Sequence, residues 1–593
     1  MSHRLLVPAR RAPLALFFGL LLPLLVQQVH YRLSIYVDQV SHDTRVTYLP
    51  LARRFLEDAA ALFADPEHLI VAPGSFIYLA LFGADNALAV QGNLALSGLL
   101  LLLAFDTLRR VAGFVAGAAA AWLLALGPLL PMVLVQALSE PPQLFCIGLW
   151  LWCAALLCER PQRRWPVLLG GVALLLSILI RATYVYWIVA ALGACLPLMA
   201  LGSPHLRRVA VRLLALHLIA GAGTLAYIGY NKATFDLPMV ATGSGAALYF
   251  GTNPAVAGYE PPYYNLLHDH FLVTDDLGHL SLEGDRRLSR VAKAALADMP
   301  APVLAGMLWQ KAGATLFFSQ ATLNRHWLNP RAWHVLLVVL ASFGLWHYRR
   351  EPFLWLLGGI AAYQWAIMTL AMHSMRYAVG SLELPLSLLA GFGLAGLWRA
   401  RRAWPVVAGV ATVTLAGMAI GYLHQRYSRP PMPDLAHAHH LRIAAAIPGQ
   451  LRLEGLDGDP FQGDGARTLD KDASIAWDGL TFPRLGGFPV VRLEARDFDP
   501  ACDYIQFDYL RPDGQLRGSR LRLNHMAPPQ VITAGTLQLE ALEPGGGTLR
   551  LRFRCPVGTR LKLDGLEIHA ITHGRYYRQQ AGLPPRPAPA AAP

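Results

Sequence analysis

Long apolar runs recur along this chain from Ala12 to Tyr422 and then stop, and no other feature limits the fold as strongly. With 54% hydrophobic and only 15% charged residues, the composition differs from that of an ordinary soluble protein. A helix crosses a bilayer with about 20 apolar residues. Taking each run as one helix predicts about eleven spans, at roughly 12–28, 87–105, 111–135, 142–157, 165–180, 184–201, 213–230, 333–346, 353–370, 379–398 and 404–422.

The arginines test this count, because cytoplasmic loops carry an excess of Lys and Arg. With the N-terminus inside, every cluster in a short loop between spans falls on the cytoplasmic side: Arg109–Arg110, then Arg160, Arg163 and Arg164, then Arg207, Arg208 and Arg212, then Arg349–Arg350, and finally Arg399, Arg401 and Arg402. An odd number of spans places the loops at about 29–86 and 231–332, and everything after about 425, outside. The net charge of +13 is concentrated in these clusters. No basic patch interleaved with aromatic residues occurs, so nucleic-acid binding is not expected.

The N-terminus resembles a secretory signal peptide, with three arginines before the first apolar run. The following stretch, Val26–His30, offers no small-residue cleavage site. We therefore expect an uncleaved first span with a cytoplasmic N-terminus.

Two external segments have the pattern of helices that lie in the membrane interface. Tyr48–Leu56 places apolar residues at helical spacing with charges on the opposite face. The segment from Ala301 to Leu323, around Trp309 and Lys311, is either a second such helix or a short extra span. We favour the interfacial interpretation, because a full crossing there would invert every later arginine cluster.

The chain after residue 435 changes from helical to alternating periodicity. Val491–Glu494 and Leu549–Arg554 alternate apolar and polar residues, as half-buried strands do, and glycine-containing turns separate such runs. We predict a β-sandwich from about 435 to 580 and a disordered Pro/Ala tail at 581–593. Cys502 and Cys555 lie in this region and could form a disulfide if it is outside the cytoplasm. The other four cysteines lie in apolar helices without metal-ligand spacing.

Asp43 is the leading candidate for chemistry, because it lies in a short polar stretch directly behind the first span. An acid at the mouth of a membrane protein is often functional. The simpler interpretation is a solvated loop acid or a helix cap for the segment that follows. Asp38 is the competing acid, and Asp43 is preferred because Tyr48 and Ala52 begin the amphipathic helix at a fixed offset behind it.

Further charged residues fall on the same predicted outer face. Glu140 is at the end of the third span, where it could simply be a boundary residue that snorkels. Arg181 lies alone between the fifth and sixth spans, on the side that the positive-inside rule disfavours, which indicates an anionic partner such as a phosphate. Arg376–Tyr377 opens the tenth span. Lys311 is the weakest candidate, since a lysine on an interfacial helix commonly contacts lipid headgroups.

Two acids and two guanidinium groups on one membrane face suit transfer of a group from a lipid phosphate to a hydroxyl or amine. A retaining glycosidase would instead need two close carboxylates, one of them a nucleophile. The sequence contains no G-x-S-x-G, no H-E-x-x-H and no phosphate-binding glycine loop. His268–Asp269–His270 could suggest a metal site, but adjacent residues on a loop rarely point at one ion.

In this order, these residues resemble the polytopic GT-C glycosyltransferases, especially the family 39-like branch of protein mannosyltransferases and aminoarabinose transferases. The resemblance covers roughly residues 10 to 425. The matching residues are Asp43 with Tyr48–Leu49 and Ala52, Ala72–Pro73–Gly74, Ser139–Glu140–Pro141, Ile180–Arg181–Ala182–Thr183, Gly251–Thr252–Asn253–Pro254 and Arg376–Tyr377.

The resemblance implies an inverting enzyme that takes a sugar from a polyprenyl-phosphate donor on the periplasmic side of the inner membrane. Asp43 would then be the general base, and Glu140 would orient the acceptor or the base. Arg181 and Arg376, with Lys311, would neutralise the departing lipid phosphate. The expected acceptor is a glycan, a lipid or a protein. No cofactor is expected, and a role for a divalent cation stays open.

Two other functions agree less well with the sequence. An oligosaccharide ligase or polymerase of cell-surface glycan would place its main catalytic residues in a large late loop, whereas Asp43 is in the first. A lipid-glycan flippase would need charged residues deep in the spans or two related halves with broken helices. The spans are nearly free of charge and the halves differ.

Overall fold

The computed structural model describes most of the chain and divides it into two compact units. The described residues are 12–34, 36–37, 40–41, 43–252, 280–297, 299–317, 330–400, 404–427, 440–445, 452–480, 488–498, 504–510, 516–522, 531–535 and 547–571. The first unit comprises the described parts of 1–243, 323–368 and 375–421, and the second those of 244–322, 369–374 and 422–593.

The first unit is helical, and each of the eleven predicted spans overlaps a helix. The helices that correspond to spans are α1 (Ala12–Leu16) continued by η2 (Phe17–Leu21) and α2 (Leu22–Arg32), α6 (Asn86–Ala112), α7 (Phe114–Leu126) followed by the short α8 (Leu130–Leu134), α9 (Glu140–Glu159), α10 (Trp165–Ile180), α11 (Val185–Leu201), α12 (Pro204–Phe235), α17 (Pro330–His347), α18 (Pro352–Leu370), α19 (Met375–Ser381) with α20 (Glu383–Arg399), and α21 (Trp404–Tyr427).

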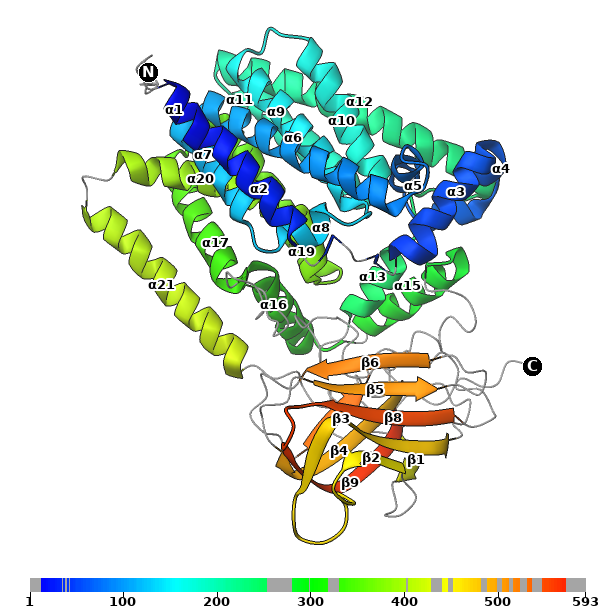
Figure 1. Ribbon diagram of the computed structural model, residues 1–593. Coiled ribbons are helices and arrows are strands. Elements are labelled where there is room, and N and C mark those ends of the chain that lie inside the picture. The colour runs from blue at the N-terminus through cyan, green and yellow to red at the C-terminus, as the bar shows by residue number, and fades with distance from the viewer. Residues whose placement is uncertain are drawn as a thin grey trace. The chain divides into compact units, whose positions relative to one another are not determined.

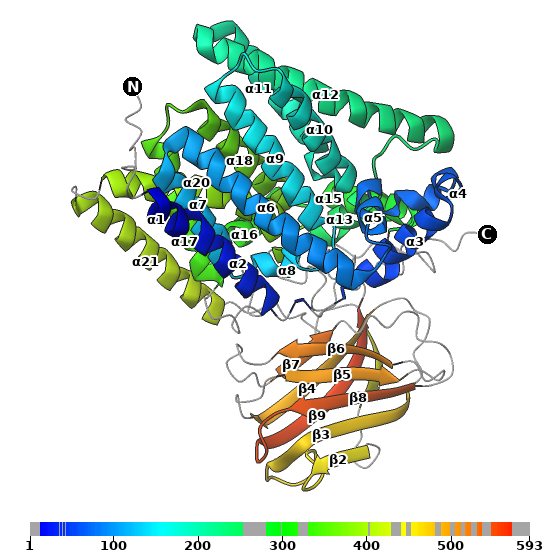
Figure 2. The same cartoon turned by 45° about the horizontal axis from the view of Figure 1, so that its top comes forward.

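Two series of packed helices share α7 (Figures 1 and 2). In the first, α7 packs against α6, α6 against α9, α9 against α10, α10 against α12, and α12 against α11. In the second, α7 packs against α20 and α20 against α17. Small residues allow these close approaches: a Cβ added to Gly391 of α20 would lie 3.1 Å from the Ala116 carbonyl oxygen of α7.

Among the described residues, length and composition qualify six helices to cross a membrane, or up to eight if each of two bent pairs is counted as one span. Three further apolar helices are shorter, at Phe114–Leu126, Trp165–Ile180 and Pro405–Ile420. The chain is therefore a membrane protein with several spans. Eleven crossings, and the side of the membrane on which each loop lies, remain predictions.

The first predicted external loop folds into short helices that pack on one another. They are η3 (Thr44–Tyr48), α3 (Leu49–Glu57), α4 (Ala59–Ala64), η4 (Pro66–Ile70) and α5 (Pro73–Ala80). The predicted amphipathic helix is confirmed, since Leu49, Leu51 and Ala52 are buried against α5 while Arg53 and Glu57 are exposed. Its apolar face is covered by protein, and the α3–α5 core includes Phe76 and Leu79.

The second unit contains three described helices and the C-terminal strands. The helices are α13 (Ser244–Gly251), α15 (Leu282–Ala297) and α16 (Ala301–Phe317). α15 and α16 meet at 120° and together pass the length and composition test for a broken span or re-entrant loop. The choice between an interfacial helix and an extra span around Trp309 therefore stays open.

The C-terminal region is all-β, as the alternating pattern predicts. Its strands are β1 (His440–Ala445), β2 (Arg452–Leu456), β3 (Arg467–Leu480), β4 (Phe488–Phe498), β5 (Tyr504–Leu510), β6 (Leu516–Arg522), β7 (Val531–Gly535), β8 (Gly547–Arg554) and β9 (Arg560–Ile571). Both runs named from the sequence lie in strands, in β4 and β8.

The strand order is β6-β5-β8-β3-β9-β4-β7, with β1 paired to β9, β2 paired to β3, and all of these pairs antiparallel. One group consists of β9 with β1, β4 and β7, and the other of β8 with β2, β3, β5 and β6. They join where Arg467 and Thr468 of β3 pair with Leu561 and Arg560 of β9. The predicted β-sandwich is thus an all-β region whose two groups of strands are connected through β3 into one sheet. The domain limits at 425, 435 and 580 remain predictions, and the tail at 581–593 is outside the described residues.

The cysteines divide as their sequence positions suggest. Cys146, Cys153, Cys158 and Cys195 are free thiols within the helices. Cys555 is disulfide-bonded. Its predicted partner, Cys502, lies outside the described residues, so the pairing itself remains a prediction.

Candidate active site

The centre of the candidate site is the carboxylate of Glu140, the first residue of α9, whose side chain is fully buried. Arg376 donates from Nε to Oε1 at 2.8 Å and from Nη2 to Oε2 at 3.2 Å. Arg181 Nη1 lies 3.0 Å from Oε1, and the Ser139 hydroxyl donates to Oε2 at 3.2 Å. A snorkelling boundary residue would reach water, so that simpler interpretation of Glu140 is wrong. Buried charge is tolerated here because both oxygens are paired.

Arg376 also reaches the leading sequence candidate. Its Nη1 donates to Oδ2 of Asp43 at 2.6 Å, so one guanidinium joins two acids that are far apart in the sequence. The Asp43 side chain is 46% exposed, against 0% for Glu140. Asp43 precedes η3 but makes no side-chain capping hydrogen bond. The helix-cap interpretation is therefore wrong, and Asp43 is the more accessible of the two acids.

Thr44 fixes the backbone that carries Asp43. Its hydroxyl donates to the Ala137 carbonyl at 2.8 Å, and its side chain is buried. Ala137 lies just before Ser139 and Glu140 in the sequence, so this bond ties η3 to the segment that leads into α9. The sequence gives little signal for Thr44, because a threonine after an acid is common at any helix start.

Arg181 is held at the point where α10 ends. Its backbone is extended after Ile180, with φ −157° and ψ 122°. The Gln143 side-chain amide donates to the Arg181 carbonyl at 3.2 Å and to the Thr183 hydroxyl at 2.9 Å. Gly74 of α5 lies against the same turn, where an added Cβ would be 3.0 Å from the Ile180 amide nitrogen. This contact explains the glycine of the Ala72–Pro73–Gly74 motif, because a side chain at residue 74 would collide with the turn.

Two tyrosines line the cluster. Tyr377 of α19 lies under both guanidinium groups, 4.3 Å from Arg181 and 6.0 Å from Arg376 measured from Cζ to the ring centroid, within reach of cation–π attraction. Tyr48 is buried, and burial raises the pKa of its phenol while the charge of Arg376 acts to lower it. Both side chains were named from the sequence, and Tyr377 offers a stacking surface to the two guanidinium groups.

Lys311 is in the second unit, and its ammonium group has other partners than the lipid headgroups expected from the sequence. Its side chain is buried, and its ammonium donates to the carbonyls of Gly251 at 2.9 Å, Ala371 at 2.6 Å and Leu370 at 3.4 Å. Three acceptors satisfy an ammonium group. A headgroup-contacting surface lysine is therefore a wrong description, and its role toward a phosphate remains a prediction without support from these contacts.

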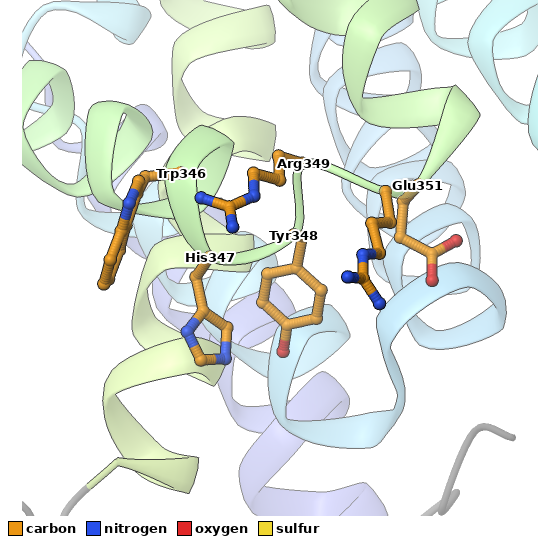
Figure 3. Close-up of a pocket in the computed structure, with 6 residues that line it drawn as sticks. Trp346, His347, Tyr348, Arg349 and Glu351 are labelled. Atoms are coloured by element: carbon orange, nitrogen blue, oxygen red, sulfur yellow. The ribbon is translucent and has the colours of Figure 1, made fainter.

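A separate cavity of about 340 Å³ lies at the turn between α17 and α18. Its lining residues include His347, Tyr348, Arg349 and Glu351, shown in Figure 3. This turn carries the Arg349–Arg350 cluster, which the predicted topology places on the cytoplasmic side. The cavity shares no residue with the Asp43–Glu140 cluster.

Within the described residues, no group of three or more His, Cys, Asp or Glu side chains could hold a metal ion. His268–Asp269–His270 lies outside those residues, as does the competing acid Asp38. The structure brings together six of the residues named from the sequence: Asp43, Tyr48, Glu140, Arg181, Arg376 and Tyr377. It adds Thr44, Gln143 and Gly380, which the sequence pattern alone did not single out.

No family model matches the chain, and no curated protein is similar to it in sequence. Several solved structures are similar to the chain, including two oligosaccharyltransferases and an arabinosyltransferase. The Archaeoglobus fulgidus oligosaccharyltransferase in complex with Zn and sulfate matches with 12% identity and a TM-score of 0.39, over 69% of this chain and 52% of that one. Oligosaccharyltransferase AglB from the same organism, in complex with an inhibitory peptide and a dolichol-phosphate, matches with 13% identity and a TM-score of 0.36, over 68% and 55%.

Arabinosyltransferase EmbB from Mycobacterium smegmatis matches with 12% identity and a TM-score of 0.24, over 98% of this chain and 66% of that one. The chain spans about half the length of the two oligosaccharyltransferase chains. All three names are those of glycosyltransferases, the class that the sequence resembles.

Proposed function

We propose that this protein is a membrane glycosyltransferase that moves a sugar from a polyprenyl-phosphate donor to an acceptor on the periplasmic side of the inner membrane. One observation carries the proposal: Arg376 joins an accessible acid, Asp43, to a fully buried acid, Glu140, with a second guanidinium, Arg181, on the same buried carboxylate. A base and an anion-binding pair of guanidinium groups are thus adjacent.

The two acids have different surroundings and so take different roles. Both oxygens of Glu140 are engaged by Arg376, Arg181 and Ser139, and the side chain has no exposure. It is unsuited to attack an anomeric carbon or to accept a proton. Asp43 has one contact with Arg376 and is half exposed, so it can meet an acceptor hydroxyl. Because a departing lipid phosphate needs no general acid, one available carboxylate that acts as base is enough for an inverting displacement. The retaining route would instead need a carboxylate nucleophile at the anomeric carbon.

In this reaction, Asp43 accepts the proton of the acceptor hydroxyl or amine. The acceptor atom forms a bond to the anomeric carbon while the bond from that carbon to the phosphate oxygen breaks. The lipid phosphate leaves with the bonding electrons, and its charge is stabilised by Arg181 and Arg376. A donor phosphate that binds Arg376 Nη1 competes with Asp43 for that nitrogen. Donor binding would therefore release the Asp43 carboxylate for its role as base.

Deletion of the encoding gene tests the function at the level of the cell. We expect an unmodified cell-surface glycan, lipid or protein, together with accumulation of one polyprenyl-linked sugar. Re-expression of the wild-type chain or of Glu351→Gln, a change at the α17–α18 turn, should restore the modification, and Asp43→Asn should not. A deletion strain with unchanged lipid-linked sugars and an unchanged envelope would contradict the proposal.

A further inference from the structure

An ionisable side chain lies buried among the helices, apart from the cluster described above. Glu383, the first residue of α20, is 1% exposed. Its Oε1 accepts a hydrogen bond from Trp333 Nε1 at 3.2 Å, and its Oε2 lies 3.1 Å from His334 Nδ1. A buried acid is costly unless its oxygens are paired, and within a membrane bundle such groups commonly serve function.

Glu383 fastens α20 to α17 close to where both helices begin. Trp333 and His334 are both buried and lie in the first turn and a half of α17. Further along, the helices touch at their backbones: a Cβ added to Gly344 would lie 2.6 Å from the Leu389 carbonyl oxygen, and one added to Gly393 would lie 2.1 Å from that of Leu340. We call the contacts of Glu383 with Trp333 and His334 the clamp. The clamp and the two glycine contacts leave α20 little freedom to move against α17.

The segment just before Glu383 carries the residues of the candidate site. α19, which contains Arg376 and Tyr377, meets α20 at 54°. Pro385 explains this bend, because proline has no N–H to donate and its ring opposes the carbonyl four residues earlier, at Ser381. Since a proline bend weakens the helical hydrogen bonds, the direction of α19 depends on what holds each side of the bend.

The two sides are held by different contacts. On the α19 side, Gly380 lies against Glu140, where an added Cβ would be 2.8 Å from Cγ. On the α20 side, the pairing of Glu383 with Trp333 and His334 fixes the first turn. Arg376 lies about two helical turns before Glu383 in the sequence. A shift of the bend would therefore move the guanidinium that joins Asp43 and Glu140.

We propose that Glu383 is a positioning residue for Arg376, acting through its contacts with Trp333 and His334 and the α19–α20 bend. The contribution to sugar transfer rests on the proposed function. The positioning itself is a property of the protein without substrate, and it can be measured independently.

Two matched variants of the protein distinguish the effect of the Glu383 hydrogen bonds from the effect of its side-chain volume. Glu383→Gln keeps a carbonyl oxygen for Trp333 and can donate an N–H to His334 Nδ1 in its other tautomer. Glu383→Met keeps a similar volume and removes both interactions, leaving buried polar groups unpaired. Amide hydrogen exchange at 375–382 should be about tenfold faster in Glu383→Met and near wild type in Glu383→Gln. Glu351→Gln serves as the control, and exchange in α9 should not change.

The proposal is overturned if Glu383→Met leaves exchange at 375–382 at the wild-type rate. It is also overturned if that variant accelerates exchange equally in α6, α9 and α20, since that would indicate general loosening. Should Glu383→Met fail to accumulate, His334→Phe, which removes one partner of the clamp, is read in the same way.

A transfer assay with a polyprenyl-phosphate sugar then tests the link to chemistry. We expect Glu383→Met to lower kcat about tenfold or more with little change in acceptor KM, and Glu383→Gln to recover most of it. If hydrogen exchange shows the expected effect of Glu383→Met but the wild-type protein has no transfer activity, the proposed function is refuted. The positioning of α19 by Glu383 would then still hold. Equal kcat values for Glu383→Met and Glu383→Gln would show that the hydrogen bonds of Glu383 do not affect the reaction.

Discussion

Gly380 of α19 lies directly against Glu140 of α9, so closely that an added Cβ would be 2.8 Å from the glutamate Cγ. Glu140 cannot retreat, because Arg376, Arg181 and Ser139 hold its carboxylate. The absence of a side chain at residue 380 is therefore what lets α19 bring Arg376 to both acids.

Gly380→Ala should disturb this arrangement without removing any functional group. Overpacking costs about 1–3 kcal/mol of stability. Because small misplacements are costly for transfer, we expect a loss of about 10–100-fold in kcat/KM. Thermal unfolding and a transfer assay on purified protein measure the two effects. Gly229→Ala, in a helical position with nothing within 4 Å of the added Cβ, is the control. Equal activity of both variants would show that the close approach is unimportant.

Asp43→Asn should abolish the base and leave the fold unchanged. The side chain is 46% exposed, and an asparagine oxygen can still accept from Arg376. A positioned general base contributes about 10²–10⁴-fold, so kcat should fall by that factor while donor binding is retained. Asp38→Asn is the comparison that the sequence demands. Near-normal transfer by Asp43→Asn together with loss in Asp38→Asn would make Asp38 the base.

Arg181→Lys should weaken use of the donor more than use of the acceptor. Lysine keeps the charge but loses the planar guanidinium that lies over Tyr377 and the fixed fork that suits a phosphate. A charge-assisted hydrogen bond contributes about 1.5–3 kcal/mol, so we expect donor KM to rise about 10–100-fold. Initial rates at varied donor and acceptor concentrations separate the two constants. Arg160→Lys, at an exposed position on the predicted cytoplasmic side, should behave as wild type.

The helical architecture and most of the cluster could be predicted because their signals are local. Each apolar run became a helix, and Asp43, Arg181 and Arg376 were conspicuous as charges on a face where few are expected. Their pairing was not predictable, since Arg376 and Asp43 are 333 residues apart. Burial of Glu140 also escaped the sequence, because an acid at a helix start normally reaches water.

The contacts of Gly380 and of the Gln143 side-chain amide could not be predicted from the sequence for a related reason. Gly380 matters only because Glu140 lies opposite, and Gln143 only because the turn after α10 passes its side chain. Neither has a pattern along the chain. Lys311 was misjudged because the carbonyls that surround it come from residues about 60 positions away in the sequence.

The disulfide at Cys555 should be found with Cys502 as its partner. Cys555 is disulfide-bonded, and the four cysteines of the helices are free, so peptide mapping under non-reducing conditions should yield one linked pair from the C-terminal region. Since a disulfide that closes a long loop stabilises by about 2–4 kcal/mol, reduction should lower the unfolding temperature of the β region. Cys502→Ser with Cys555→Ser should reproduce the reduced protein. Free thiols at both positions would refute the pairing, and with it the main chemical support for placing the β region outside the cytoplasm, where disulfides persist.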